Sequence, residues 1–131
     1  MPVSERVKNF IFEHIDSIEA LEILLLFHAN QSKSWSYATL ASELRSNPNS
    51  AESRSQVLHA LQIIREKPGV SGEFYYDPEN RDYAAIVDEL AQHYRIQRHK
   101  IFELIFSPLK KARDFAEAFK KSDPKEGKQD G

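Results

Sequence analysis

Residues 15–30, IDSIEALEILLLFHAN, decide the fold of this chain of 131 residues. Between Ala20 and Phe27 only Glu22 is charged. A helix that is apolar nearly all the way round has to be covered by neighbours on several sides. The run is also too short to cross a bilayer, which needs about 20 apolar residues. We therefore predict that it forms the central helix of a small helical domain.

The start of this central helix is marked in the sequence. Asp16 is a candidate for the N-cap, because short acidic side chains accept hydrogen bonds from the free amides of a first turn. Glu19 follows it at the spacing of a capping box. We therefore expect Asp16 to cap a helix over residues 15–30.

The composition indicates one globular domain without thiol chemistry. Apolar residues make up 40% of the chain, the formal charge is −2, and there is no cysteine. Disulfides, thiolate nucleophiles and cysteine zinc sites are thereby excluded. The opening MPVSERVKNF lacks the apolar core of a signal peptide. We therefore expect a cytoplasmic protein that does not enter a membrane.

No motif in the sequence predicts an enzyme or a cofactor. A hydrolytic nucleophile would stand on a strained turn, and no such motif is present. Glu89 and His93 are four residues apart on one predicted helix face, but the spacing supplies no third metal ligand. We expect a surface ion pair there, and we predict no catalytic residue, no metal and no cofactor.

Helices are predicted on both sides of the central one. Residues 4–14 form a first helix. A helix over 36–45 follows the central one, with Ser36 as its N-cap and Trp35 before it. After the turn formers of 46–50, a helix over 51–67 is predicted, ending at Pro68 and Gly69. Its inward side is expected to consist of Val57, Leu58, Leu61 and Ile64.

The rest of the chain reads as one strand and two helices. Residues 70–76, VSGEFYY, favour a strand, with Ser71 and Gly72 at the tip of a hairpin whose first strand is nearly absent. A long helix is predicted over 80–106, with a bend within 95–100, and a last helix over 108–121. The tail 122–131 has no apolar side chains to bury and is expected to be disordered.

The block 36–76 resembles the winged helix-turn-helix fold. The central helix 15–30 takes the place of that fold's first helix, and residues 1–14 and 80–121 resemble the dimerisation helices of bacterial MarR-like regulators. The phrases HIDSIEALEILLL and IFELIFSPLKKARDFAEAF are similar to those of small bacterial winged-helix proteins without a settled function. The resemblance implies a mainly α protein with a winged-helix domain over 15–79 and an N-terminal helix over 1–14. The apolar stripes of 83–105 and 109–119 favour a homodimer formed by 80–121.

This resemblance implies a transcriptional regulator that binds duplex DNA as a dimer. The second helix of a helix-turn-helix enters the major groove with its N-terminal residues at the base edges, where Arg can read guanine and Gln adenine. Lys33 and Arg45 are candidates for backbone contacts. The candidates on the helix are Ser53, Arg54, Ser55, Gln56, His59 and Gln62.

The charge of the hairpin supports an alternative function. The hairpin and its exit carry four acidic residues, with Arg81 the one cation predicted there, and phosphate would be repelled. The alternative is a winged-helix module that binds an unknown protein and no DNA. A solvated helix face without a ligand is a third interpretation of the candidate residues. The four acidic residues are Glu73, Asp77, Glu79 and Asp82.

Overall fold

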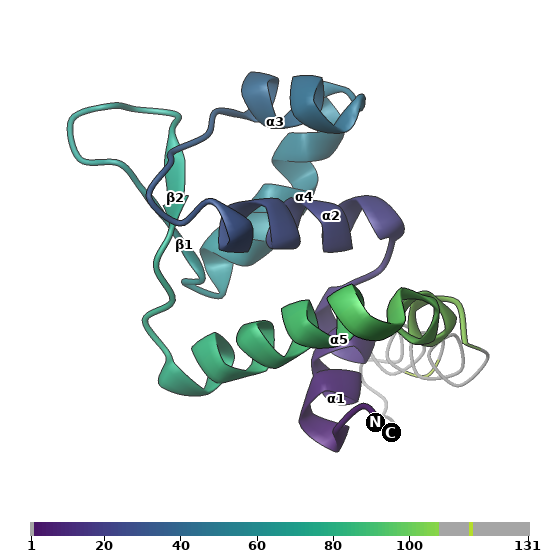
Figure 1. Cartoon of the computed structure of the whole chain (residues 1–131). Coiled ribbons are helices and arrows are strands. Elements are labelled where there is room, and N and C mark those ends of the chain that lie inside the picture. The colour runs from purple at the N-terminus through teal and green to yellow at the C-terminus, as the bar shows by residue number, and fades with distance from the viewer. Residues whose placement is uncertain (1, 108–115, 117–131) are drawn as a thin grey trace, which may run out of the picture.

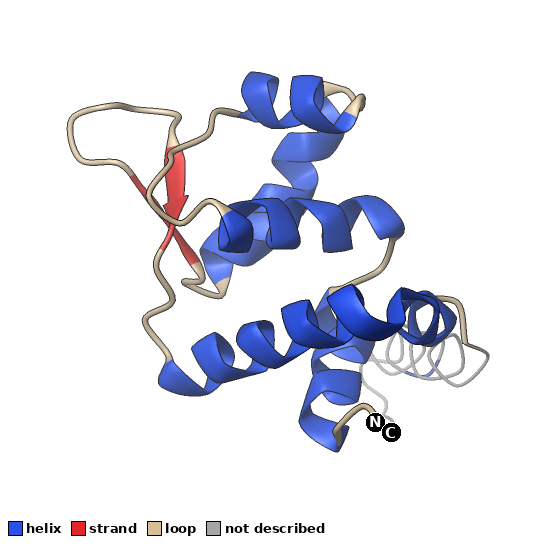
Figure 2. Cartoon of the chain, in the orientation of Figure 1, coloured by secondary structure: helices blue, strands red, loops and turns tan. Residues whose placement is uncertain are grey.

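The computed structural model describes residues 2–107 and residue 116. This part of the chain is mainly helical, with five helices and one two-stranded antiparallel sheet (Figures 1 and 2). None of the described helices combines the length and the apolar character needed to span a bilayer. The predicted helix over 108–121 and the tail 122–131 lie outside the described residues, apart from residue 116, which is helical.

Helix α2 (Ile18–Ala29) lies at the centre of the fold (Figure 1). It contacts α3, α4, α5 and β2. Its side chains Leu21, Ile23, Leu24 and Phe27 have no exposed surface. The prediction that this helix is covered on several sides is therefore confirmed.

The start of α2 differs from the prediction. The N-cap is Ser17, whose Oγ accepts a hydrogen bond from the Ala20 amide at 3.0 Å. Asp16 precedes the cap, and its carboxylate accepts hydrogen bonds from Arg54 instead. The expectation that Asp16 caps this helix is therefore wrong, because the backbone is still extended at Ser17 and the helix starts one residue later.

Helix α3 (Tyr37–Leu44) starts as predicted. Ser36 caps it, and a capping box forms because the Ser36 Oγ accepts from the Thr39 amide while the Thr39 hydroxyl accepts from the Ser36 amide. The helix ends at Arg45, which adopts a left-handed conformation with a φ of 56°.

Helix α4 (Pro48–Ala60) corrects the predicted helix over 51–67 at both ends. It begins earlier because Asn47 caps it and Pro48 suits a first helical position. It ends earlier because Gln62 has a φ of 59°, which no right-handed helix contains. Strand β1 (Ile64–Glu66) follows at once.

Strand β1 pairs with β2 (Phe74–Tyr76) in antiparallel register, with Ile64 opposite Tyr76. Trp35 adds an isolated bridge to Phe74. The expectation that the first strand is nearly absent is wrong, because that strand precedes Pro68 instead of beginning there. Ser71 and Gly72 lie in the loop that connects the two strands, as predicted.

This corrected hairpin also contains cations that the prediction left out. Arg65 and Lys67 belong to it, so Arg81 is not the one cation present. Arg65 is engaged within the hairpin and its exit: its Nε lies 3.1 Å from the Asp77 carboxylate and its Nη2 lies 3.5 Å from that of Glu79.

Helices α1 (Glu5–His14) and α5 (Arg81–Ile105) pack against each other below α2 (Figure 1). The predicted bend in the long helix is confirmed at Gln97, whose φ of −144° and ψ of 59° interrupt the helix. Both helices contribute apolar residues to the core. These residues are Val7, Phe10 and Ile11 of α1 and Val87, Leu90 and Ile101 of α5.

A polar network, here called the Glu89 cluster, joins α1 to α5 and comprises Ser4, Arg6, Glu89, His93 and Gln97. Glu89 lies 3.1 Å from the Arg6 Nε and 3.5 Å from the His93 Nε2. The Gln97 Nε2 lies 2.8 Å from the His93 Nδ1, and both side chains are buried. Hydrogen bonds from Ser4 and Arg6 hold the pKa of Glu89 below its ordinary value.

Candidate functional site

Helix α4 carries most of the candidate DNA-binding residues, and its faces are unequal. The side packed into the fold consists of Ala51, Ser55 and Leu58, each with 2% or less of its surface exposed. The outward side includes Gln56 and Val57. Val57, which the helical spacing predicts to be inward, is 42% exposed.

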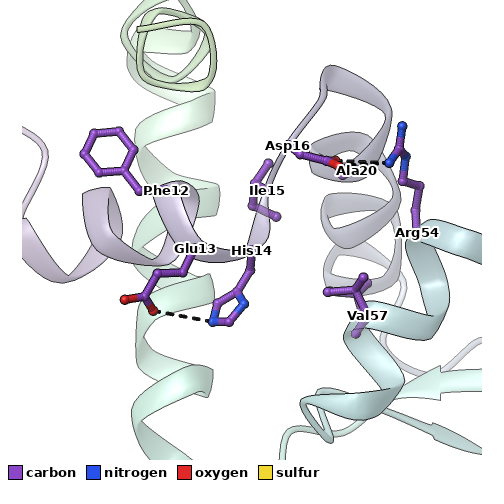
Figure 3. A pocket seen from close by; sticks show the side chains of 9 residues that line it. Phe12, Glu13, His14, Ile15, Asp16, Ala20, Arg54 and Val57 are labelled. Carbon is purple, nitrogen blue, oxygen red and sulfur yellow. Dashed lines mark hydrogen bonds and ion pairs between the residues drawn. The ribbon is translucent and has the colours of Figure 1, made fainter. Parts of the chain in front are cut away.

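Arg54 is turned toward the start of α2 (Figure 3). Its Nη1 donates to both carboxylate oxygens of Asp16 at 3.1 and 3.2 Å, and its Nε lies 3.5 Å from Glu19. Glu19 also accepts short hydrogen bonds from Ser46 and Ser50. We call these five residues the Glu19 cluster. It ties α4 and the turn before it to α2.

The electrostatics of this cluster favour an ionised carboxylate. Burial acts to raise the pKa of Glu19, but hydrogen bonds from Ser46 and Ser50 and the charge of Arg54 outweigh it, so that the pKa lies below its ordinary value. The Arg54 guanidinium is therefore opposed by two anions from the protein itself. A phosphate or a base edge would have to compete with both.

The other candidates on α4 are in different environments. Ser55 is 1% exposed, and its Oγ makes no hydrogen bond within the described residues. Ser53 is exposed and donates to the Asn49 carbonyl at 3.2 Å. Gln56 is exposed and donates to Glu52 at 3.1 Å. Of these three, Ser53 and Gln56 are therefore accessible and Ser55 is not.

The remaining candidates lie in three places. His59 and Lys33 lie near the Trp35–Phe74 bridge, since the His59 ring packs edge-on to Phe74 at 5.1 Å and the Lys33 Nζ lies 4.2 Å above the Trp35 ring. Gln62 is exposed in the turn between α4 and β1. Arg45 is exposed at the far end of α3. The eight predicted residues therefore do not form one continuous surface.

The overall charge of the predicted winged-helix region is negative. Residues 15–79 contain nine acidic and five basic residues. Arg54 and Arg65 are already paired with carboxylates. The acidic residues are Asp16, Glu19, Glu22, Glu43, Glu52, Glu66, Glu73, Asp77 and Glu79, and the basic ones are Lys33, Arg45, Arg54, Arg65 and Lys67.

A cavity of about 340 Å³ opens beside the Glu19 cluster, between the end of α1, the start of α2 and the middle of α4 (Figure 3). We call it the α1–α4 groove. Sequence reasoning missed it, because its walls come from three segments that the fold brings together. Its lining consists of Phe12, Glu13, His14, Ile15, Asp16, Ala20, Arg54, Val57 and Leu58.

The one histidine of the groove is held neutral. Burial lowers the pKa of His14 below its ordinary value, and the neighbouring Glu13 carboxylate, 3.7 Å away, only partly opposes this. The ring packs edge-on to Phe10 at 5.2 Å and to Tyr83 at 6.2 Å. His14 therefore adds no positive charge to the groove at neutral pH.

Comparison of the chain with protein-family models, with curated proteins and with solved structures finds no match. A function therefore has to be inferred from the side chains and their arrangement.

Proposed function

We propose that this chain is a protein-interaction module built on a winged-helix-type unit over residues 15–79. Three helices followed by a hairpin, with Trp35 bridging to the second strand, support this type of unit. The observation that carries the proposal is the engagement of Arg54 by Asp16 and Glu19. The helix in the recognition position thereby uses its one arginine within the fold.

The charge balance supports the same proposal. A DNA-binding surface gains most of its affinity by neutralising phosphates with Lys and Arg. Residues 15–79 have an excess of acidic side chains, and within the hairpin Arg65 is engaged by Asp77 and Glu79. A protein partner does not require a positive surface.

A purified-protein assay separates the two functions. A labelled random-sequence duplex at low salt should show no saturable binding to the full chain in the non-specific range, about 10⁻⁴ to 10⁻⁶ M. The immobilised chain should retain a specific protein from lysate, and nuclease treatment should not release it. Saturable duplex binding that weakens with added salt would overturn the proposal.

DNA binding as a transcriptional regulator is the second candidate, favoured by two accessible side chains. Ser53 and Gln56 are exposed on α4, and an adenine can be read by Gln. If this function holds, Gln56→Ala should weaken binding to a selected duplex by about 1–3 kcal/mol. The same change should leave retention of a protein partner intact if the first function holds.

We further propose that the chain forms a homodimer through α5. Ile96 on α5 is 62% exposed, and Phe106, the C-cap residue that follows this helix, is 57% exposed, so both could be covered by a partner. Light scattering should give twice the chain mass, and Ile96→Glu should shift it toward the monomer. A monomeric wild-type chain at high concentration would contradict this pairing.

A further inference from the structure

The α1–α4 groove has an apolar floor that opens to solvent. Ile15 and Leu58 are 1% and 2% exposed, and Ala20 is 8% exposed. Val57 stands at the edge with 42% of its surface exposed. The volume of about 340 Å³ is at the lower end of the range for ligand pockets, about 300–1,000 Å³. It therefore suits one or two inserted side chains and not a large ligand.

The rim of the groove is acidic. The side chains of Glu13 and Asp16 are 54% and 62% exposed. Among the lining residues, Arg54 is the one lysine or arginine against these two carboxylates, and it is also paired with Glu19 outside the lining. His14 is neutral for the reason given above. The groove therefore combines an apolar floor with an excess of negative charge.

The arrangement disfavours an anionic ligand. A phosphate or carboxylate would have to displace Asp16 from Arg54, where it accepts two hydrogen bonds. Both hydrogen bonds come from the Nη1 nitrogen, and charge-assisted hydrogen bonds are stronger than neutral ones. A cation, by contrast, can approach the outer faces of Glu13 and Asp16 without breaking any contact of the Glu19 cluster.

We propose that the α1–α4 groove binds a short basic segment of a protein partner. An apolar side chain of the segment inserts over Val57 and Leu58, and flanking Lys or Arg side chains pair separately with Glu13 and with Asp16, which lie on different sides of the groove (Figure 3). This rests on the proposed protein-interaction function and states the chemistry of the partner. The affinity falls with added salt, because exposed ion pairs are screened by it.

Selection from a random-peptide display library on the immobilised full chain tests the proposal. The enriched peptides should contain Leu, Ile, Met or Phe next to Lys or Arg. Addition of an enriched peptide should shift the amide resonances of Ile15, Val57 and Leu58 in the labelled protein. No enrichment, enrichment of acidic peptides, or shifts confined to other surfaces would overturn the proposal.

A pair of matched variants tests whether the peptide binds at this groove. Val57→Lys should weaken an enriched peptide at least about tenfold, a change of about 1.4 kcal/mol. Val70→Lys makes the same change at another exposed valine, 38% exposed in the hairpin loop, and should have no effect. Equal effects of the two variants would contradict the assignment to this groove.

A charge reversal provides a test that does not depend on Val57. Glu13→Lys should weaken the peptide several-fold and reduce its salt dependence, whereas Glu43→Lys on the exposed side of α3 should not. If Glu13→Lys leaves binding unchanged, the proposed ion pair is wrong.

Three further outcomes of these experiments distinguish a different occupant of the groove from a failure of the protein-interaction function. If light scattering shows that Val57→Lys abolishes self-association, the groove holds a second copy of this chain and the proposal fails. Duplex binding in the assay described above would sink the protein-interaction function itself. Failure of the peptide selection without duplex binding rejects this groove alone.

Discussion

The Glu19 cluster and the Glu89 cluster are polar networks that each link two helices, in two different parts of the molecule. In each, a glutamate accepts hydrogen bonds from serine side chains of another segment and forms an ion pair with an arginine of a neighbouring helix. The Glu89 cluster ends inside the protein at His93 and Gln97, where the helix bends. The Glu19 cluster instead opens to solvent at the α1–α4 groove.

The difference shows that the position of an arginine in the fold decides how deeply its ion pair is buried. Arg6 and Arg54 both pair with a glutamate from a neighbouring helix. Arg6 is 54% exposed and Arg54 is 31% exposed in the side chain. Arg54 is therefore the more deeply held of the two, although the sequence resemblance predicts that its helix reads bases.

The largest effect on the free energy of unfolding should come from a substitution in the apolar core, which both parts of the molecule share. Leu24 of α2 has no exposed surface, so Leu24→Ala should lower the free energy of unfolding by about 2–5 kcal/mol. Trp35 fluorescence reports the hairpin side, and far-UV circular dichroism reports the helices. The two transitions should coincide. Separate transitions would mean that the two clusters belong to independently folding parts.

The two arginines should differ in their contribution to stability. Arg54→Gln should lower the free energy of unfolding in urea by about 1–3 kcal/mol, because it removes the hydrogen bonds to Asp16 and the ion pair with Glu19, whose side chain is 21% exposed. Arg6→Gln should cost less than about 1 kcal/mol, as expected of an exposed pair. Equal costs would remove the distinction between the clusters.

The free energy of unfolding should fall in two separate pH ranges as the pH is lowered. The lowered pKa of His14 means that its contribution is complete above its ordinary value of 6.5 and is lost as the pH falls below it. The lowered pKa values of Glu19 and Glu89 give contributions that are complete above 4.5 and are lost as the pH falls further. Unfolding free energies measured across this range should show both losses.

Variants assign the two ranges. His14→Phe keeps the ring contacts with Phe10 and Tyr83 but cannot titrate. The difference in unfolding free energy between this variant and the wild type should therefore be constant above pH 6.5 and should change with pH below it. Glu19→Gln and Glu89→Gln should each remove part of the lower loss. If the unfolding free energies of the wild type and of His14→Phe change equally between pH 6.5 and 5, the first assignment is contradicted.

The sequence predicted the parts of the fold that depend on local signals. The all-round apolar run over 15–30 predicts the central helix, Ser36 predicts the cap of α3, and the polar stretch 95–100 predicts the bend at Gln97. Each follows from side chains close together in the chain. The predicted helix boundaries at residues 51 and 67 were wrong. The observed boundaries depend on the cap at Asn47 and on the positive φ at Gln62, which leave weak signals in the sequence.

The candidate site could be predicted only in part. Helical spacing placed Val57 on the inward side, and the resemblance placed Ser55 among the DNA contacts, whereas Val57 is exposed and Ser55 is buried. The packing of α4 against α2 and α3 decides which side is covered. The pairing of Arg54 with Asp16 joins residues 38 positions apart. Such a contact depends on the tertiary fold, and local periodicity contains no information about it.

The central claim is that Arg54 serves the fold, and a double-mutant cycle between Asp16→Asn and Arg54→Gln tests it most directly. The unfolding free energies of the wild type, the two single variants and the double variant give the coupling between the two side chains. The account predicts a favourable coupling of about 0.5–1 kcal/mol. A coupling indistinguishable from zero, with Arg54→Gln as stable as the wild type, would show that the arginine is free to act on a ligand.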